Sequence, residues 1–267
     1  MNIKLLAVDI DGTLVTKNKE LTEITKNAIK KYIKGGGKFA IATGRPNKGI
    51  ERYIDELNLH ELGGYVISYN GSRIFDAKTG ELLYQKNLKP SQLPQIFDAA
   101  EKYNINLTTY KGDTAVTEKA DDKYFNLEVS INKLSVKRVT DLKKEITYPI
   151  PKFLITGESE YLIEIEKRLK KDLFGVSVFR SEPFFLEITP NGVDKGEAFL
   201  WLSDYMGIMQ NETMACGDGF NDITLLKAAG TGVAMENAQD ITKNSADFVT
   251  LSNDENGVAY AINKFIF

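Results

Sequence analysis

The sequence lacks the residues that disulfides, zinc clusters and membrane spans require. Its single cysteine, Cys216, excludes an intramolecular disulfide, and with His60 as the single histidine there is no Cys/His cluster to bind zinc. No uninterrupted apolar run approaches the ~20 residues of a membrane helix. The 34 basic and 37 acidic residues form no block of one sign, so nothing favours a nucleic-acid or membrane-surface partner.

The length and composition fit a globular protein with a sizeable core. The chain has 267 residues, of which 42% are hydrophobic, so one large domain or two smaller ones can be built. The first apolar stretch, within MNIKLLAVDIDG, is too short and too acidic for a secretion signal, and we therefore expect a cytoplasmic protein, either a monomer or a homodimer.

The first ~70 residues alternate strand and helix. Residues 4–10 form an apolar run, residues 22–34 carry apolar side chains at helical spacing, and Gly35-Gly36-Gly37 ends that helix. KFAIAT and GYVISYNG supply two further apolar strands. This order predicts an α/β fold with a doubly wound, parallel, Rossmann-like sheet.

The middle of the chain has a different pattern. SRIFDAKTGELLYQK alternates polar and apolar residues around a turn, which indicates a hairpin. Short strands then mix with helices predicted near 95–103, 136–146 and 160–173, an α+β pattern. Parallel-sheet strands return in ETMACGD, GTGVAM and DFVTL, with helices predicted at 222–229, 238–245 and 256–267. We expect a core domain made from residues 1–83 and 187–267, with an α+β domain inserted at 84–186.

Polar residues gather where these parallel strands end. Ligands of open parallel sheets bind at the carboxyl ends of the strands. Four such places carry matched polar residues: Asp9 and Asp11, then Thr43-Gly44-Arg45, then Lys195, and finally the run from Gly217 through Asp218 and Asn221 to Asp222.

Together these residues suit phosphoryl transfer. That reaction needs a nucleophile in line with phosphorus, a metal and a cation to neutralise its oxygens, and hydroxyl or amide donors. Asp9 and Asp218 with one backbone carbonyl would suffice for Mg²⁺, which prefers oxygen ligands and keeps several waters. Asp11, two residues past Asp9, can exchange a proton with the leaving-group oxygen.

The motifs in this order resemble the haloacid dehalogenase superfamily, and within it the Cof-like sugar phosphatases. They are DIDGT, the Thr of IATGR, the Lys of GVDKGEA, and GDGFND; GVAMENA and NDENGVAYAI look like the family's usual ending. The resemblance implies a Mg²⁺-dependent phosphatase that hydrolyses a small phosphorylated metabolite, such as a sugar phosphate, through an aspartyl-phosphate intermediate.

The resemblance also implies a role for each residue. Asp9 would be the nucleophile, Asp11 the general acid and base, and Lys195 the cation beside Asp9. The metal would be held by Asp218, the Asp9 carboxylate and the Asp11 backbone carbonyl. Asp222 would not bind the metal directly but would support the metal site and Lys195. The phosphate would be held by Thr43, the Gly44 amide and Asn221, and we expect further substrate contacts at Arg45, Asn70 and Gly71.

The position of the insert refines the assignment. The interval between the first two motifs is too short for a domain, whereas a whole domain fits between Thr43 and Lys195. This resembles the large α/β cap of Cof-like enzymes. Two alternatives stay open: a phosphomutase of the same superfamily, and a non-enzymatic sensor of phosphorylated ligands. A structural alternative for Asp9 and Asp11 is that they cap a turn, as aspartates after strands often do. We expect Cys216 to be a buried thiol and His60 to be a surface residue.

Overall fold

The computed structural model describes residues 3–267, and the chain divides into two compact units. The first unit is formed from three stretches and the second from two. The first unit takes residues up to 44, 51–85 and 194–267; the second takes 45–50 and 86–193.

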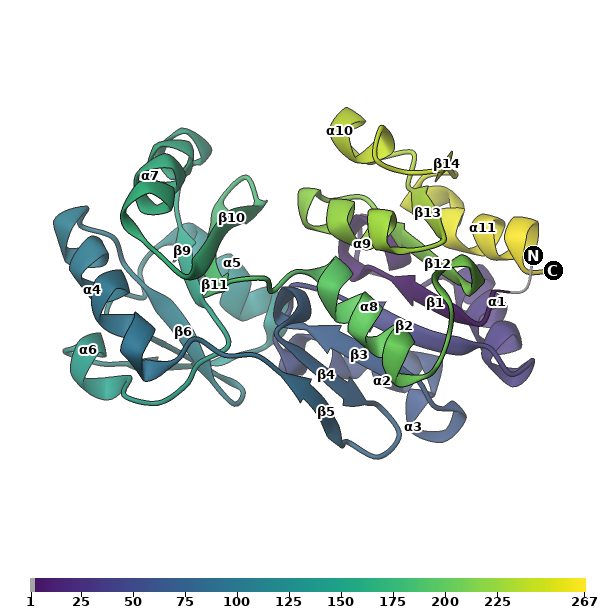
Figure 1. Cartoon of the computed structure of the whole chain (residues 1–267), viewed down its shortest axis with the longest axis horizontal. Coiled ribbons are helices and arrows are strands. Elements are labelled where there is room, and N and C mark those ends of the chain that lie inside the picture. Colours follow the sequence, from purple (N-terminus) through teal and green to yellow (C-terminus); the bar gives the residue numbers. More distant parts are fainter. Residues whose placement is uncertain (1–2) are drawn as a thin grey trace. The chain divides into compact units, whose positions relative to one another are not determined.

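An eight-stranded sheet forms the middle of the first unit (Figure 1). Its order is β14-β13-β12-β1-β2-β3-β4-β5. All pairs from β14 to β3 are parallel, and β3, β4 and β5 pair antiparallel. This confirms the predicted parallel α/β fold and the predicted hairpin. The strands are β1 (Leu5–Val8), β2 (Lys38–Ala42), β3 (Tyr65–Ser68), β4 (Arg73–Asp76), β5 (Leu82–Gln85), β12 (Thr213–Gly217), β13 (Thr231–Ala234) and β14 (Phe248–Val249).

Helices cover both faces of this sheet. One layer contains α1 packed against α11, and the other contains α8 packed against α9 (Figure 1). Helix α1 begins where the Thr22 side chain accepts a hydrogen bond from Thr25 N, and it ends at the glycines, with Gly36 at φ 93°. The helices are α1 (Glu23–Lys34), α2 (Glu51–Leu57), α3 (Leu59–Leu62), α8 (Lys195–Tyr205), α9 (Ile223–Ala228), α10 (Asp240–Lys243) and α11 (Gly257–Phe265).

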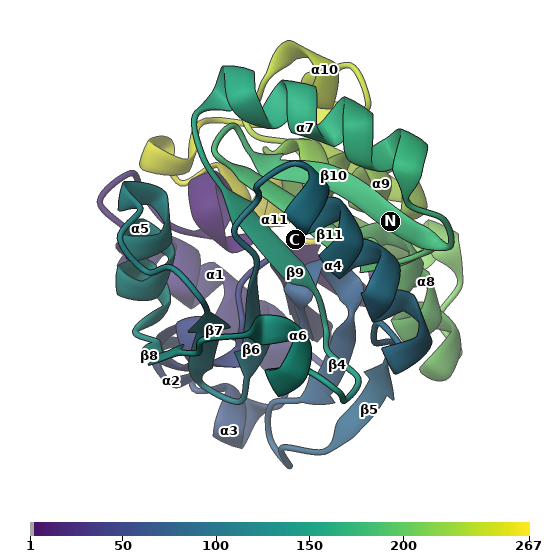
Figure 2. The same ribbon diagram turned by 90° about the vertical axis from the view of Figure 1, so that its left-hand side faces the viewer.

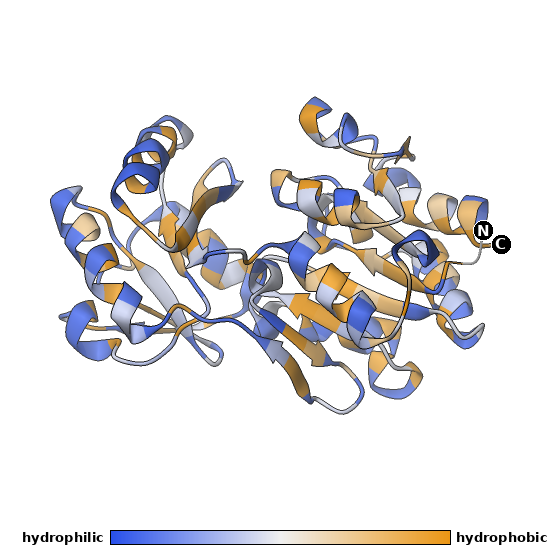
Figure 3. Cartoon of the chain, viewed as in Figure 1, coloured by the Kyte–Doolittle hydropathy of each residue, from blue (hydrophilic) through white to orange (hydrophobic). Residues whose placement is uncertain are grey.

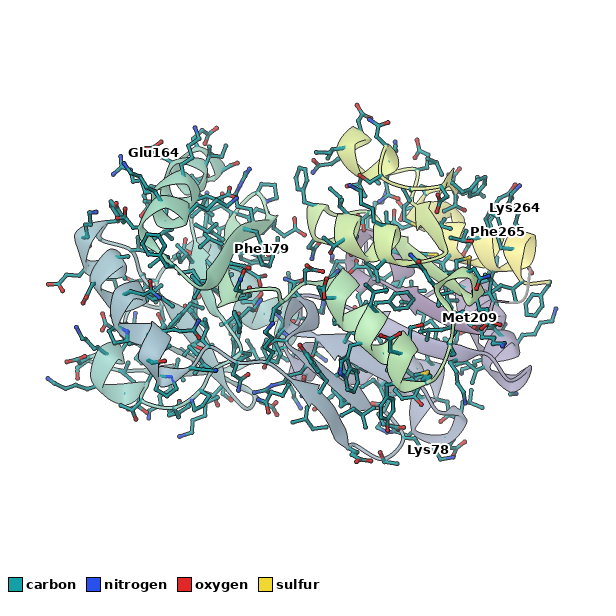
Figure 4. All side chains as sticks on the ribbon, viewed as in Figure 1. Lys78, Glu164, Phe179, Met209, Lys264 and Phe265 are labelled. Atoms are coloured by element: carbon teal, nitrogen blue, oxygen red, sulfur yellow. The ribbon has the colours of Figure 1, made fainter. Side chains whose placement is uncertain are left out.

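Apolar side chains of the strands make the core of the first unit. The strand ribbons are largely hydrophobic along their length (Figure 3), as expected for a sheet covered on both faces. Phe199 of α8 is fully buried in the cluster that includes Ala7 and Ala215. At the β14 edge of the sheet, Phe265 of α11, labelled in Figure 4, packs edge-on against Phe248 of β14, with ring centroids 5.3 Å apart.

The second unit has its own six-stranded sheet, in the order β10-β11-β9-β6-β7-β8. Helices α4 and α7 cover one face of it (Figure 2), where their apolar side chains pack on Phe153 and Ile155. The strands are β6 (Thr108–Lys111), β7 (Thr114–Thr117), β8 (Ser135–Arg138), β9 (Phe153–Thr156), β10 (Val176–Glu182) and β11 (Phe185–Pro190). The helices are α4 (Leu93–Lys102), α5 (Lys123–Asn132), α6 (Leu142–Glu145) and α7 (Ser159–Asp172).

Sequence reasoning was wrong in one segment of this unit. The helix predicted near 136–146 is instead strand β8, which pairs parallel to β7, followed by the single turn of α6. Asp141 starts that turn by accepting a hydrogen bond from Lys144 N. Val136, Val139 and Thr140 are β-branched and favour a strand, and pairing with β7, which the local pattern does not reveal, prevails over the helical spacing of the apolar residues in 136–146.

Among residues 3–267, no helix combines the length and the apolar character needed to cross a bilayer.

We expect the core of the first unit to depend strongly on Phe199. Phe199→Ala removes a fully buried ring and should lower the free energy of unfolding by about 3–5 kcal/mol. Leu200→Ala, at a neighbouring side chain that is 36% exposed, should lower it by less than about 1 kcal/mol. Trp201, the single tryptophan, lies on the same helix, so its fluorescence during urea unfolding reports on this unit. Equal losses in the two variants would contradict this packing.

Candidate active site

Three neighbouring strands bring the predicted residues to one edge of the sheet. β1 lies between β12 and β2, and Val8 is in register with Cys216 on one side and Ile41 on the other. Asp9 directly follows β1, Thr43 follows β2, and Asp218 follows β12. Residues that are up to 209 positions apart in the chain thereby end at the same sheet edge (Asp9 and Asp218).

Lys195 connects this edge to helix α8. Its Nζ lies 2.6 Å from Asp9 Oδ1 and 2.6 Å from Asp222 Oδ1, and its side chain is 0% exposed. Lys195 is the first residue of α8, and Asp194 caps the helix by accepting a hydrogen bond from Glu197 N. The helix start therefore fixes the position from which the lysine reaches the two carboxylates.

The buried charges alter one another's protonation. Burial, and after it the Asp222 carboxylate, raises the pKa of Asp9 above its ordinary value, although Lys195 opposes the shift. Burial alone would lower the pKa of Lys195, but the Asp222 and Asp9 carboxylates outweigh it and hold that pKa above the ordinary value. The lysine therefore stays charged, whereas the neutral form of Asp9 is favoured more than it would be in water.

Asp222 organises the loop after β12. Its Oδ2 accepts hydrogen bonds from Asp218 N at 3.0 Å and from Gly219 N at 2.9 Å, while its Oδ1 is bound by Lys195. Both oxygens of Asp222 are thus used within the protein. The arrangement suits a residue that holds Asp218 and Lys195 in place.

The acidic group fits a hard divalent cation. Asp9, Asp218 and Asp222 each bring a carboxylate oxygen within 4.8 Å of the other two. Oxygen donors such as these carboxylates are the ligands that Mg²⁺ prefers. Thr13 Oγ1 donates to Asp218 Oδ1 at 2.7 Å and orients that carboxylate. The side chain of Asp11 points to another partner, since its Oδ1 lies 2.6 Å from Lys19 Nζ.

The turn after Asp9 is shaped by Gly12. Its φ is 79°, a conformation that favours glycine, and a Cβ placed there would lie 2.7 Å from Asp218 Cγ. Its carbonyl accepts a hydrogen bond from Asn237 Nδ2 at 2.8 Å. The chain can therefore approach Asp218 closely only because residue 12 has no side chain.

Of the residues predicted for phosphate binding, Thr43 and Gly44 follow β2, whereas Asn221 follows β12. Thr43 is buried, and its carbonyl accepts a hydrogen bond from Asn70 N at 3.0 Å. Asn221 Nδ2 donates to Asn70 Oδ1 at 2.9 Å, and a Cβ on Gly44 would lie 3.0 Å from the same Asn70 amide. Asn70 thus joins the loop after β3 to the loop after β12.

Gly71 and Arg45 have different surroundings. Gly71 has φ 102°, and a Cβ there would overlap the backbone carbonyl of Asp194, so this glycine allows α8 to begin close to β3. Arg45 belongs to the second unit, where it donates to Gly49 O at 3.1 Å and to Ile131 O at 3.4 Å. Substrate contact by either residue stays a prediction.

Sequence reasoning missed three residues that contact the site: Thr13, Lys19 and Asn237. Thr13 lies within DIDGT and Asn237 within GVAMENA, so the motifs were noticed but not these side chains. Lys19 belongs to no motif, and only the folded loop brings it to Asp11.

Cys216 and His60 do not belong to the predicted chemistry. Burial raises the pKa of the Cys216 thiol to about 12, so it is protonated at neutral pH. His60 is largely exposed, with Nδ1 3.0 Å from Ala77 O and Nε2 3.2 Å from Asp55 Oδ1.

Known proteins match this chain over nearly its whole length. A solved haloacid dehalogenase-like hydrolase from Bacteroides thetaiotaomicron is 38% identical with a TM-score of 0.90, covering 99% of this chain and 100% of that one. YxeH of Bacillus subtilis (strain 168) is 35% identical over 267 residues, 98% of each chain. The solved structure of the HAD subclass IIB sugar phosphatase BT4131 is 27% identical with a TM-score of 0.86, covering 98% of each. The family model for haloacid dehalogenase-like hydrolases matches residues 6–262. The chain belongs to this family of hydrolases, which confirms the resemblance seen in its motifs.

Proposed function

We propose that this hydrolase is a Mg²⁺-dependent phosphomonoesterase that acts on a small phosphorylated metabolite through a phosphoaspartate. One observation carries the proposal: the buried Lys195 ammonium binds both Asp9 and Asp222, and Asp218 lies beside them at the carboxyl ends of β1 and β12. This group supplies a nucleophile, a fixed cation and a set of oxygen ligands, which phosphoryl transfer requires together.

In the first step, Asp9 attacks the phosphorus of the bound ester. Lys195 binds Asp9 Oδ1, and we assign the attack to Oδ2. The new bond joins Oδ2 to phosphorus, and the bond between phosphorus and the ester oxygen breaks. The Asp11 carboxyl gives its proton to that oxygen, so the alcohol leaves in its neutral form.

In the second step, water hydrolyses the phosphoaspartate. The Asp11 carboxylate takes a proton from water as the water oxygen attacks phosphorus. The bond between phosphorus and Asp9 Oδ2 breaks, which releases inorganic phosphate and restores both aspartates. Asp11 therefore begins each cycle protonated and is protonated again at its end.

Other residues hold the phosphoryl group and the metal. We assign the phosphate contacts to the Thr43 hydroxyl, the Gly44 amide and Asn221, and the metal ligands to Asp9, Asp218 and the Asp11 carbonyl. When bound, Mg²⁺ would neutralise negative charge on the phosphoryl oxygens. Asp222 would keep Lys195 and the Asp218 loop in position through the hydrogen bonds described above.

A sugar phosphate is the substrate class we favour. This preference is supported by BT4131, a structural relative over 98% of both chains whose structure is described as that of a sugar phosphatase. We further propose that the second unit is the cap that selects the alcohol part of the substrate, with Arg45 among the residues involved.

The direct test measures phosphate release from a panel containing sugar phosphates, nucleotides, pyridoxal phosphate and an aryl phosphate, with Mg²⁺ or with EDTA. Release that requires Mg²⁺ supports the proposal. Isomerisation of a sugar phosphate without phosphate release would favour a phosphomutase, and binding of these compounds without any turnover would favour a sensor.

Asp9→Asn should abolish turnover without unfolding the protein. The amide has the same shape as the carboxylate but cannot form the phosphoaspartate, so kcat should fall by at least about 10⁴-fold. Because the substitution also removes one negative charge from the crowded acidic group, the free energy of unfolding should not decrease. Asp55→Asn, at an exposed position, is the control and should keep full activity. Substantial activity in Asp9→Asn would contradict the mechanism.

Gly12→Ala should weaken Mg²⁺ binding, because its Cβ would push against the Asp218 carboxylate. Loss of ligand orientation typically lowers metal affinity by about 10–100-fold. Gly63→Ala is the matched control, since Gly63 has a similar φ of 85° but a Cβ there would meet no atom within 4 Å. Its backbone strain should lower the unfolding free energy by about 1–3 kcal/mol, because φ 85° with ψ 160° is a conformation essentially limited to glycine, and should leave Mg²⁺ affinity unchanged. Calorimetric titration measures both affinities, and equal values would contradict the role of Gly12.

A further inference from the structure

A tight loop after the Asp9 turn presents Lys19 to Asp11. Thr16 N donates to Glu20 O at 3.0 Å, and Lys19 N donates to Thr16 O at 2.8 Å, which closes the loop. Lys19 adopts a left-handed conformation with φ 62°, which is uncommon for a lysine. The strained residue is thus the one that reaches Asp11.

The contact between them is close but not deeply buried. Lys19 Nζ lies 2.6 Å from Asp11 Oδ1, and the two side chains are 44% and 28% exposed. Ion pairs at this level of exposure stabilise a fold very little. Because stability does not explain a pair held by a strained backbone, the pair is better explained by what it does to Asp11.

The C-terminal segment 252–257 anchors this loop at three points. Asn253 Nδ2 donates to Val15 O at 2.8 Å, and Lys17 N donates to Asp254 Oδ1 at 3.0 Å. Thr22 Oγ1 donates to Asn256 Oδ1 at 2.5 Å. The NDENG part of the last motif, which the proposed chemistry does not use, therefore fixes the loop that carries Lys19.

We propose that Lys19 is a positioning residue for Asp11. By binding Oδ1, it holds the side chain of the proton donor in one orientation, at the place where the leaving-group oxygen must receive its proton. The inference rests on the proposed function, because Asp11 acts as a proton donor only if the site transfers a phosphoryl group. A donor must lie within hydrogen-bond reach of its acceptor, so a freely rotating Asp11 would transfer its proton less often.

The test compares Lys19→Met with a substrate that needs the proton and one that does not. The alcohol part of an alkyl phosphate leaves as a strongly basic alkoxide unless its oxygen is protonated. The nitrophenolate of a nitrophenyl phosphate is weakly basic and leaves without a proton. The ratio kcat/KM reports the steps up to departure of the leaving group. For Lys19→Met we expect kcat/KM to fall about tenfold with the alkyl phosphate and by less than about twofold with the aryl phosphate.

Two further variants serve as controls. Lys17→Met removes a charge from the same loop, at a side chain that is 78% exposed, and should leave both substrates within about twofold of wild type. Lys19→Arg keeps a cation at residue 19 and should restore most of the activity toward the alkyl phosphate.

Each remaining outcome is decisive. Equal losses with both substrates, a rise in KM alone, or unchanged kinetics in Lys19→Met would overturn the positioning role while leaving the proposed function intact. Wild-type protein that hydrolyses neither phosphate would instead overturn the proposed function, and this inference with it.

Discussion

The site depends on one buried ammonium group. Lys195 is fully enclosed and binds carboxylates from two different loops, Asp9 after β1 and Asp222 after β12. A charge without a partner in such a place would destabilise the fold by several kcal/mol, so the start of α8 and the two strand ends must stay in register. Hydrophobic residues of similar volume could fill this space at least as well. We therefore interpret the ion group as serving chemistry rather than stability.

The same group creates an imbalance that a metal would correct. Three acidic residues bring their carboxylates close together, one lysine binds two of them, and the pKa of Asp9 is raised by its burial and by Asp222. Backbone geometry keeps these residues close, since Gly12 allows the turn after Asp9 to lie against Asp218. In the loop from Val15 to Thr22, Lys19 binds the Asp11 carboxylate, and Val15 O accepts a hydrogen bond from Asn253 of the C-terminal segment. In the proposed mechanism, Asp222 thus supports both the nucleophile Asp9, through Lys195, and the metal ligand Asp218, whereas the proton donor Asp11 has its own contact with Lys19.

The sequence was most informative where a short pattern controls the structure. Apolar runs predicted the parallel strands of the first unit, and the glycines after α1 predicted its end. The strand ends predicted which polar residues meet, because carboxyl ends of neighbouring parallel strands share one sheet edge. Helix α5 was not predicted, since its buried positions include the polar residues Glu128 and Asn132, which hide the helical periodicity. Segment 136–146 was assigned wrongly because its pairing with β7 is a long-range contact. Lys19 was missed for the same reason: its position is set by hydrogen bonds to residues more than 230 positions later in the chain, such as that from Asn253 to Val15.

In the proposed mechanism, Asp9 carries the phosphoryl group during turnover. The most direct measurement is a rapid acid quench of the wild-type protein reacting with a phosphomonoester that bears radiolabelled phosphorus, followed by peptide mapping. We predict label on the peptide that contains Asp9, in a bond that hydroxylamine cleaves, as an acyl phosphate requires. Label bound covalently to a residue other than Asp9 would contradict the mechanism.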